Sequence, residues 1–343
     1  MTTNILTTNT LATSTLGNSS IEVTEMGFGG ASLGAAGDRV SEEQVTQILQ
    51  AAYDIGIRYF DTAPLYGHGL SERRLGRFLS TLPRDTFALS TKVGRLLVPE
   101  DEGERNDLMQ DSEPFAIRYD YSYDAARASV EASLDRLGLD RVDVLLCHDI
   151  DIWTHGDGQP EILKTAREGI LPALSDLRSE GVIGAFGLGV NEWQVCDQIL
   201  EEFDVDCFLL AGRFTLLEQD PLDVFLPHCA RKNVSVIIGG PYNSGILANV
   251  DRRRATYDYK PVDDARWEKA QKIREVCESH NVDLRAAALQ YPLKHPAVAT
   301  VIPGVWKMEE LQTNMELFTA EIPPALWQDL EDAGLVRMDG IKI

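Results

Sequence analysis

Short, nearly continuous apolar runs recur eight times along the chain, and segments with a different apolar spacing separate them. Runs of this kind are typical of parallel strands that are buried on both faces of a sheet. The predicted strands are residues 26–30, 58–62, 87–92, 142–147, 185–189, 207–212, 234–239 and 299–303.

The segments between these runs carry apolar residues at helical spacing. Ser41 to Gln44 has the sequence of a capping box, and Gly56 suits the position after the helix that follows. The predicted helices are the one that begins at residue 41 and residues 71–80, 124–137, 161–179, 192–203, 223–232, 264–279 and 309–317, with a final helix near 324–333.

Strand and helix alternate eight times, which predicts an α/β fold, a single-domain (β/α)8 TIM barrel, rather than an open doubly wound sheet. Residues 27–30 read Gly-Phe-Gly-Gly and lack the spacing of the G-x-G-x-x-G motif, so a Rossmann domain is not favoured.

Two segments stand apart from this alternation. Residues 1–20 are rich in Thr, Asn and Ser and are predicted to be a flexible leader, so the barrel domain is residues 21–343, with a small hairpin at 21–24. Residues 94–121 form a long insertion after the third strand. It is either a solvated loop or a lid over the pocket. The lid is favoured because the insertion leaves the face on which barrel enzymes build their sites.

Composition narrows the class of function. The chain has 343 residues, a net charge of −22 and a pI near 4.6, which argues against nucleic acid and anionic membranes as partners. A nucleotide remains compatible, because backbone N–H groups hold phosphates locally. Five cysteines without a CxxC pair, no membrane-spanning run and no secretory signal predict a cytoplasmic protein.

Four polar residues stand at the ends of predicted strands. Asp61 ends the second strand, Tyr66 lies in the loop after it, Lys92 ends the third strand, and His148 follows the fourth. Singly, each has an ordinary explanation: a turn cap, a packed ring, a surface lysine and a satisfied core histidine. Together they share one rim of the barrel, where an ammonium near a phenol lowers the phenol's pKa. The set predicts proton transfer at a carbonyl or alcohol carbon, with no nucleophile and no metal site.

The phrases F-D-T-A-P-L-Y-G, S-T-K-V-G and L-L-C-H-D resemble the Asp-Tyr-Lys-His tetrad of the aldo-keto reductase superfamily, and the resemblance extends over residues 26–317. It implies catalytic roles for Asp61, Tyr66, Lys92 and His148. Residues 120–124 and 288–296 resemble the branch that holds D-threo-aldose 1-dehydrogenases, L-fucose dehydrogenases and pyridoxal 4-dehydrogenases.

The resemblance implies a nicotinamide cofactor bound in an extended form. Phe214 stands where the family has a tyrosine that stacks on the nicotinamide, with core packing as the alternative. Asn191 lies near the family's carboxamide contact, and residues 240–247 resemble the pyrophosphate loop. The candidate cofactor contacts are Gly30, Asp61, Asn191, Phe214, Pro241, Asn243, Ser244, Gly245, Leu247, Gly304, Trp306, Lys307, Glu310 and Asn314.

NAD is preferred to NADP in this interpretation. Trp306 stands where many relatives have an arginine for the 2′-phosphate, and Glu309 and Glu310 would repel that phosphate or accept from a free hydroxyl. Lys307 is the argument for NADP.

The predicted function is therefore an NAD(P)-dependent oxidoreductase of a small sugar or aldehyde. The preferred reaction oxidises an aldose of the L-fucose or D-arabinose type at C1 to the lactone, with Tyr66 as general base. Tyr66, His148, Phe115, Trp153 and Tyr242 are predicted to line the substrate pocket. The alternatives are an NADPH-dependent aldehyde or ketone reductase, a pyridoxal 4-dehydrogenase, and a nucleotide-sensing regulatory subunit without catalysis. Direction and oligomeric state, monomer or homo-oligomer, stay open.

Overall fold

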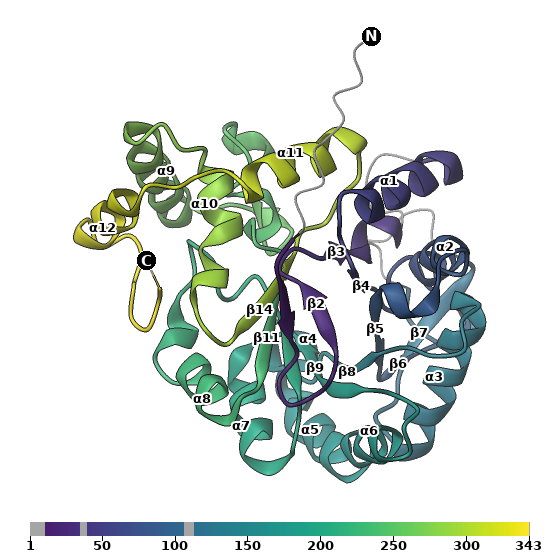
Figure 1. The fold of residues 1–343 in the computed structure, drawn as a ribbon. Helices are drawn as coiled ribbons and strands as arrows, with labels where there is room; N and C mark the ends of the chain where they lie inside the picture. The colour runs from purple at the N-terminus through teal and green to yellow at the C-terminus, as the bar shows by residue number, and fades with distance from the viewer. Residues whose placement is uncertain (1–10, 35–39, 106–112, 343) are drawn as a thin grey trace.

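The structure is a computed structural model, and it describes residues 11–34, 40–105 and 113–342. Eight parallel strands lie at its centre, each inside or within one residue of a predicted apolar run (Figure 1). These strands are β3 (Phe28–Gly29), β4 (Tyr59–Asp61), β5 (Ala88–Val93), β8 (Val144–His148), β9 (Ala185–Val190), β10 (Cys207–Ala211), β11 (Ser235–Gly239) and β14 (Val298–Ile302).

The sheet closes on itself. Its strand order is β14-β11-β10-β9-β8-β5-β4-β3, and the ends meet through parallel bridges from Met26 to Val301 and from Gly29 to Gly304. All parallel pairs run in chain order, so the carboxyl ends of the strands form one rim. The prediction of a (β/α)8 barrel is confirmed.

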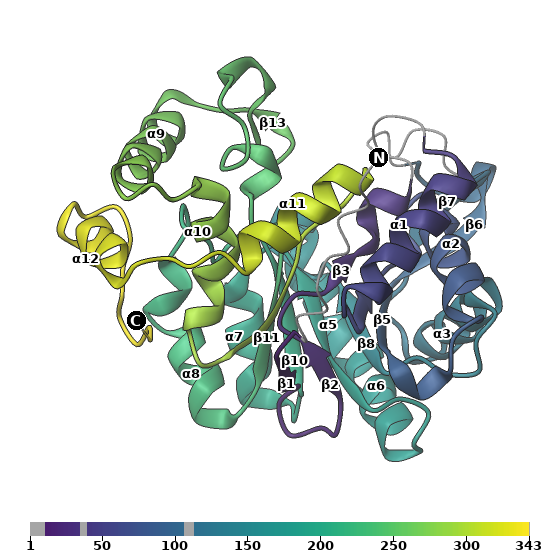
Figure 2. The same ribbon diagram turned by 45° about the horizontal axis from the view of Figure 1, so that its top comes forward.

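Helices surround the barrel in Figures 1 and 2. They are α1 (Glu42–Asp54), α2 (Leu70–Leu79), α3 (Tyr123–Leu137), α4 (Ile152–His155), α5 (Gln159–Glu168), α6 (Ile170–Ser179), α7 (Trp193–Glu202), α8 (Phe225–Lys232), α9 (Asp264–Ser279), α10 (Leu284–Gln290), α11 (Met308–Phe318) and α12 (Pro324–Asp332). The capping box at Ser41 is present, with its hydroxyl accepting from the Gln44 N–H.

Two helix predictions need correction. Residues 161–179 form two helices instead of one, because the chain breaks at Gly169, whose φ and ψ are −121° and −84°. There the Ile170 N–H donates to the Tyr121 carbonyl oxygen at 2.9 Å instead of continuing the helix. Helices α4 and α10 were not predicted. Both are short, and both begin at an aspartate cap, Asp151 and Asp283.

An N-terminal hairpin covers the end of the barrel where the strands begin (Figures 1 and 2). It pairs β1 (Thr13–Thr15) with β2 (Glu22–Thr24), and the loop between them places Leu16, fully buried, against the start of the strands. Residues 11–20 are therefore part of the fold and not of a flexible leader, because they bury apolar surface. Residues 1–10 of the predicted leader lie outside the described residues.

The insertion after β5 is not a plain loop. It contains an antiparallel hairpin of β6 (Arg95–Pro99) and β7 (Phe115–Tyr119). Leu97 and Ile117 on this hairpin pack with Ala63, Leu65 and Tyr66 of the loop after β4. Residues 106–112 of the insertion lie outside the described residues, and the lid role stays a prediction.

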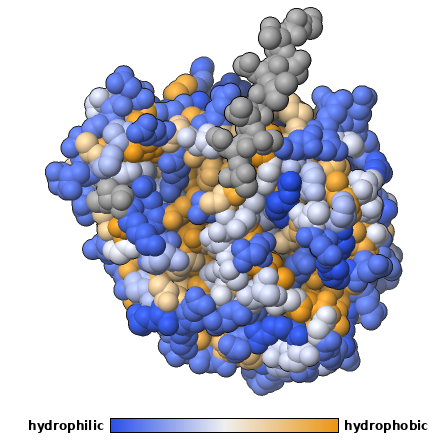
Figure 3. Space-filling view, viewed as in Figure 1, coloured by the Kyte–Doolittle hydropathy of each residue, from blue (hydrophilic) through white to orange (hydrophobic). Residues whose placement is uncertain are grey.

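On the face seen in Figure 3, hydrophilic residues cover the outer parts and apolar residues gather toward the middle. All five cysteines are buried free thiols. Within the described ranges, no helix has the length and apolarity to cross a membrane.

Candidate active site

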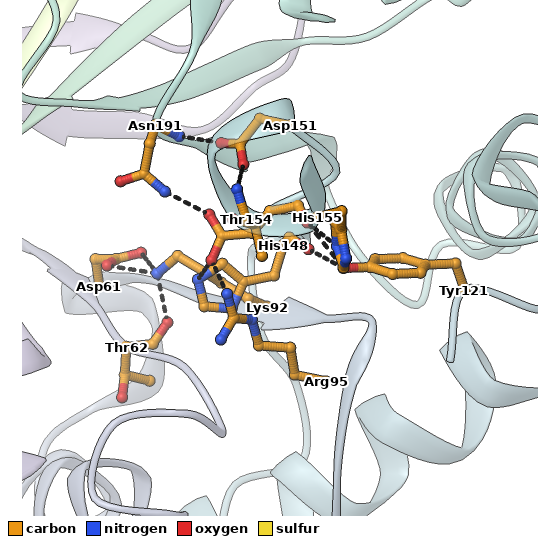
Figure 4. Close-up of polar contacts among 11 residues, drawn as sticks. Asp61, Thr62, Lys92, Arg95, Tyr121, His148, Asp151, Thr154, His155 and Asn191 are labelled. Carbon is orange, nitrogen blue, oxygen red and sulfur yellow. Dashed lines mark hydrogen bonds and ion pairs between the residues drawn. The ribbon is translucent and has the colours of Figure 1, made fainter. Parts of the chain in front are cut away.

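Lys92 and Asp61 form a buried ion pair inside the barrel mouth. The Lys92 ammonium donates to both Asp61 carboxylate oxygens, at 2.9 and 2.7 Å, and to the Thr62 carbonyl oxygen at 2.8 Å (Figure 4). Both side chains are almost fully buried. Burial alone would lower the pKa of Lys92, but Asp61 and Tyr66 outweigh it and the pKa is raised, so the ammonium is charged.

Tyr66 lies on the loop after β4 and faces this pair. The Lys92 nitrogen is 4.8 Å from the centre of the Tyr66 ring. A close backbone contact fixes the loop: Gly67 has a φ of 64°, and a side chain there would come within 2.6 Å of the Gly34 carbonyl oxygen. Glycine is therefore required next to the tyrosine.

The pKa of Tyr66 corrects one expectation. The nearby ammonium was predicted to lower it, but burial raises the pKa of Tyr66 to about 12, and the negative Asp61 adds to this effect. Lys92 works in the opposite direction through its charge and a hydrogen bond. In this structure the phenol is therefore protonated at neutral pH.

His148, the last residue of β8, completes the group. Its ring meets the Tyr66 ring edge-on, with 6.2 Å between the ring centres. Burial, and then the charges of Arg95 and Lys92, hold the pKa of His148 well below its usual value, so the ring is neutral. Its Nδ1 atom is buried and has no hydrogen-bond partner among the described residues. The four residues predicted from the sequence therefore meet at one rim.

A second charged group next to the four was not predicted. Asp149 forms a buried ion pair with Arg95 of β6, and its other carboxylate oxygen accepts from the Asn191 amide at 3.0 Å. Asp151 accepts from the Asn191 backbone N–H at 2.7 Å and caps α4 through the Thr154 N–H (Figure 4). The signal was in the sequence, since two acids directly follow a buried strand in His-Asp-Ile-Asp, but their partners lie far away along the chain.

Comparison with known proteins places the whole chain in a family. A family model described as the Aldo/keto reductase family matches residues 25–334. The chain belongs to this family. It is 38% identical to D-threo-aldose 1-dehydrogenase from Pseudomonas sp over 322 residues, which cover 92% of this chain and 95% of that protein.

Two further similarities support the assignment. Pyridoxal 4-dehydrogenase from Microbacterium luteolum is also 38% identical, over 328 residues that cover 92% of this chain and 95% of that protein. The holo form of the aldo-keto reductase AKR11C1 from Bacillus halodurans matches the fold with a TM-score of 0.74 at 25% identity, covering 95% of this chain and 97% of that chain. This aldo/keto reductase is thus an oxidoreductase of a family that works with a nicotinamide cofactor.

The rim of this aldo/keto reductase fits such a cofactor. Three glycines leave open space at the rim. At Gly212, Gly240 and Gly304 an added Cβ would meet no atom closer than 3.5 Å. The loop after β11 turns through Asn243, Ser244 and Gly245, all with positive φ. Bare backbone in such turns offers N–H groups to phosphates. Asn191 stands at the same rim, half-buried.

Three other candidate cofactor contacts are buried or tightly packed in this structure. Phe214 is fully buried against Tyr291 and His295, so no face of its ring is available for stacking, and its position is that of a core residue. Leu247 is fully buried as well. Gly30 packs against strand β4, since a side chain there would lie 2.5 Å from the Asp61 carbonyl oxygen. Burial of these residues depends on tertiary packing, which the motif does not reveal.

The loop after β11 is tied to its neighbours. The Asn243 side chain bridges to the loop after β10, donating to the Gly212 carbonyl oxygen at 2.8 Å. Tyr242 donates to Asn314 of α11 at 2.8 Å. The Tyr242 hydroxyl therefore faces α11 and the predicted adenosine end, and its contact with a substrate stays a prediction. Pro241 is buried beside it and Ser244 is half-buried.

Glu310 caps the start of α11. Its carboxylate accepts from the Trp306 N–H at 2.7 Å and from the Lys307 N–H at 3.3 Å. A negative charge already stands at the positive end of this helix, where a phosphate would otherwise be stabilised. Trp306 is half-buried and lines a small pocket with Arg74 and Val305.

Two predicted wall residues come from loops on either side of His148. Trp153 of α4 is 48% exposed, and its backbone N–H donates to Glu192 at 2.9 Å. Phe115 begins β7 and is half-buried, opposite Pro99 in the hairpin. Their contact with a substrate stays a prediction.

Proposed function

We propose that this aldo/keto reductase oxidises an aldose of the L-fucose or D-arabinose type at C1 to the lactone, with NAD⁺ as the preferred cofactor. The observation that carries the proposal is the buried Lys92 ammonium, which contacts the Asp61 carboxylate on one side and the Tyr66 ring on the other. The similarity to D-threo-aldose 1-dehydrogenase over almost the whole chain supports the choice of substrate class.

In this proposal the residues divide the chemistry between them. Tyr66 acts as a base in its phenolate form, which the charge of Lys92 stabilises. The phenolate takes the proton of the anomeric hydroxyl. Asp61 balances the charge of Lys92. Neutral His148 holds the substrate oxygen next to the Tyr66 ring, or relays its proton. A nicotinamide bound at this rim would supply the acceptor for the hydride that leaves C1. In the reverse direction the Tyr66 phenol protonates the oxygen of a reduced carbonyl.

The candidate cofactor contacts fall into three groups, one for each part of the dinucleotide. Asn191 would hold the nicotinamide amide, the loop of residues 240–247 would hold the pyrophosphate, and Gly304 to Asn314 would hold the adenosine. The Glu310 carboxylate at the start of α11 supports NAD⁺ over NADP⁺, because a 2′-phosphate there would meet a like charge. Lys307 at the adjacent position is the feature that favours NADP⁺.

A second candidate substrate is pyridoxal. Pyridoxal 4-dehydrogenase has the same sequence identity to this chain, 38%, as D-threo-aldose 1-dehydrogenase. Aldoses and pyridoxal share one chemical property: an internal hydroxyl closes on the aldehyde to give a cyclic hemiacetal. Oxidation of either hemiacetal gives a lactone by the same proton and hydride transfers. The candidate site of Tyr66, Lys92 and His148 therefore serves both.

Replacing Tyr66 with Phe tests the general base. The ring stays but the transferable proton is lost, so kcat should fall by about a hundredfold to ten-thousandfold. Affinity for the dinucleotide, measured by fluorescence titration, should stay near that of the wild type. Tyr123→Phe is the matched control, because Tyr123 lies on the outer side of α3 and its hydroxyl bonds Asp176. Near-normal turnover by Tyr66→Phe refutes the assignment.

A substrate panel tests the reaction. L-fucose, D-arabinose, pyridoxal and simple aldehydes are compared with each dinucleotide, in both directions, and the product is checked for the lactone. The proposal expects the highest kcat/KM for an aldose with NAD⁺. A clear preference for aldehyde reduction with NADPH contradicts it, and a preference for pyridoxal selects the second candidate. Tight dinucleotide binding without any turnover would favour a regulatory role.

A further inference from the structure

The β6–β7 hairpin reaches into the candidate site through one side chain. Arg95, the first residue of β6, forms an ion pair with Asp149, and each side chain is only 8% exposed. A pair buried to this extent is stable only with close contact and further hydrogen bonds. The hairpin also packs Leu97 and Ile117 against the loop that carries Tyr66. It therefore contacts the loops of two of the four candidate catalytic residues.

Asp149 in turn contacts two residues of the site. One carboxylate oxygen lies 3.3 Å from Nε2 of His148, and the other accepts from the Asn191 amide at 3.0 Å. A carboxylate accepts but does not donate, so it favours the tautomer of neutral His148 that carries its proton on Nε2.

The backbone at Asp149 is unusual and firmly held. Its φ is 47°, a conformation that costs free energy for any residue except glycine. Its carbonyl oxygen accepts from the Tyr121 hydroxyl at 2.8 Å and contacts Nε2 of His155 at 2.8 Å. The left-handed turn directs the Asp149 side chain toward both Arg95 and His148. A conformation of this kind persists where the surroundings fix it, and it is common at functional sites.

We propose that Asp149 and Arg95 are positioning residues for the reaction: Asp149 keeps the proton of His148 on Nε2, and Arg95 holds Asp149 in its ionised form. The inference rests on the proposed function of the tetrad. In this proposal the insertion hairpin supports the catalytic centre through Arg95.

This arrangement predicts a specific pH dependence. Burial raises the pKa of Asp149 to about 6, against the opposing effect of Arg95. The ionised form, and the activity that depends on it, is present above this pH and is lost as the pH falls through it. The groups that face Asp149 and share in this balance are Lys92, Arg95, Tyr66, Tyr121, Cys147, His148, Asp151, His155 and Tyr259.

Three variants of the full-length protein test the pair by steady-state kinetics. Asp149→Asn keeps the shape but removes the charge, and kcat should fall by about a hundredfold because His148 is misplaced. KM should change much less. Arg95→Met should shift the acid limb of the kcat profile to higher pH, because Asp149 loses its cation. Arg95→Lys should restore part of the wild-type profile.

A matched ion pair at the other end of β8 provides the control. Arg84 binds Asp143 at 2.7 Å, five residues before His148, and both side chains are largely buried. Asp143→Asn should lower the melting temperature and leave kcat and its acid limb unchanged. If Asp149→Asn and Asp143→Asn both lower the melting temperature and neither alters kcat, Asp149 has only a structural role and the proposal is wrong.

Histidine NMR separates this inference from the proposed function. Long-range ¹H–¹⁵N spectra report which imidazole nitrogen carries the proton, and His148→Gln assigns the signal without any turnover. The wild type should show a neutral His148 protonated on Nε2, and Asp149→Asn should alter that pattern. Identical His148 signals in both proteins would overturn the positioning role, whereas a lack of sugar oxidation by the wild type would overturn only the proposed function.

Discussion

At the scale of single residues, burial and charge compete at the candidate site. Lys92 stays charged although it is buried, because Asp61 accepts two of its hydrogen bonds. At Tyr66 burial has the larger effect. The Lys92 ammonium lowers the pKa of the phenol, but burial raises it more, to about 12. The residue that we propose as the general base is therefore protonated in the resting protein.

The rate of oxidation should consequently rise with pH. Below its pKa, the ionised fraction of Tyr66 increases about tenfold for each pH unit. We expect kcat/KM for aldose oxidation to increase from about pH 7 to about pH 9, whereas reduction, which needs the protonated phenol, should not increase. Steady-state rates in both directions measure this. A flat oxidation profile over that range contradicts the base role of Tyr66.

At the scale of elements, the two hairpins serve opposite ends of the barrel. The β6–β7 hairpin lies against the loops of the candidate site through Arg95 and Leu97. The β1–β2 hairpin closes the other end, where the Gly17 N–H donates to the Ser235 hydroxyl at 2.8 Å at the start of β11. A change in the second hairpin should therefore affect stability and spare chemistry.

Leu16→Ala tests this separation. Leu16 is fully buried among Val23, Tyr59 and Val144, so truncation should lower the free energy of unfolding by about 2–5 kcal/mol. The value of kcat at a temperature where the variant is folded should match the wild type. Chemical denaturation and steady-state kinetics measure the two quantities, with the exposed Thr13→Ala as control. An unchanged denaturation midpoint would show that the hairpin does not close the core.

At the scale of the whole molecule, the barrel is a single closed sheet, so a ligand at the rim contacts loops from several strands. The candidate cofactor residues Asn191, Asn243, Gly304 and Asn314 follow three different strands, β9, β11 and β14. Binding there should stabilise the domain as a unit, since a ligand that binds only the folded state shifts unfolding by mass action.

Thermal denaturation with each dinucleotide tests cofactor preference at this scale. A ligand present at one hundred times its Kd stabilises the folded state by about 2.7 kcal/mol. At equal concentrations NAD⁺ should raise the melting temperature more than NADP⁺, because Glu310 caps α11 with a negative charge. The variant Glu310→Gln should narrow the difference. A larger shift with NADP⁺ would contradict the preference.

The apolar pattern along the chain was enough to predict the order of the barrel strands and most of the helices. Apolar spacing is a local property, and a strand buried on both faces has a pattern that no surface segment shares. The sequence also placed Asp61, Tyr66, Lys92 and His148 at one rim, because the ends of parallel strands must meet there. The break at Gly169 and the short helices were missed, since each depends on a local cap or on a contact with a distant backbone group.

The surroundings of those four residues could not be predicted, because they depend on how the whole chain packs. Arg95 and Asp149 are separated by 54 positions, and nothing in the local pattern pairs them. Phe214 has the residue type for stacking, but it is enclosed by Tyr291 and His295. The direction of the Tyr66 pKa likewise depends on how completely the folded chain excludes water from the phenol. Burial is a sum over contacts from many parts of the chain, and only the folded protein specifies that sum.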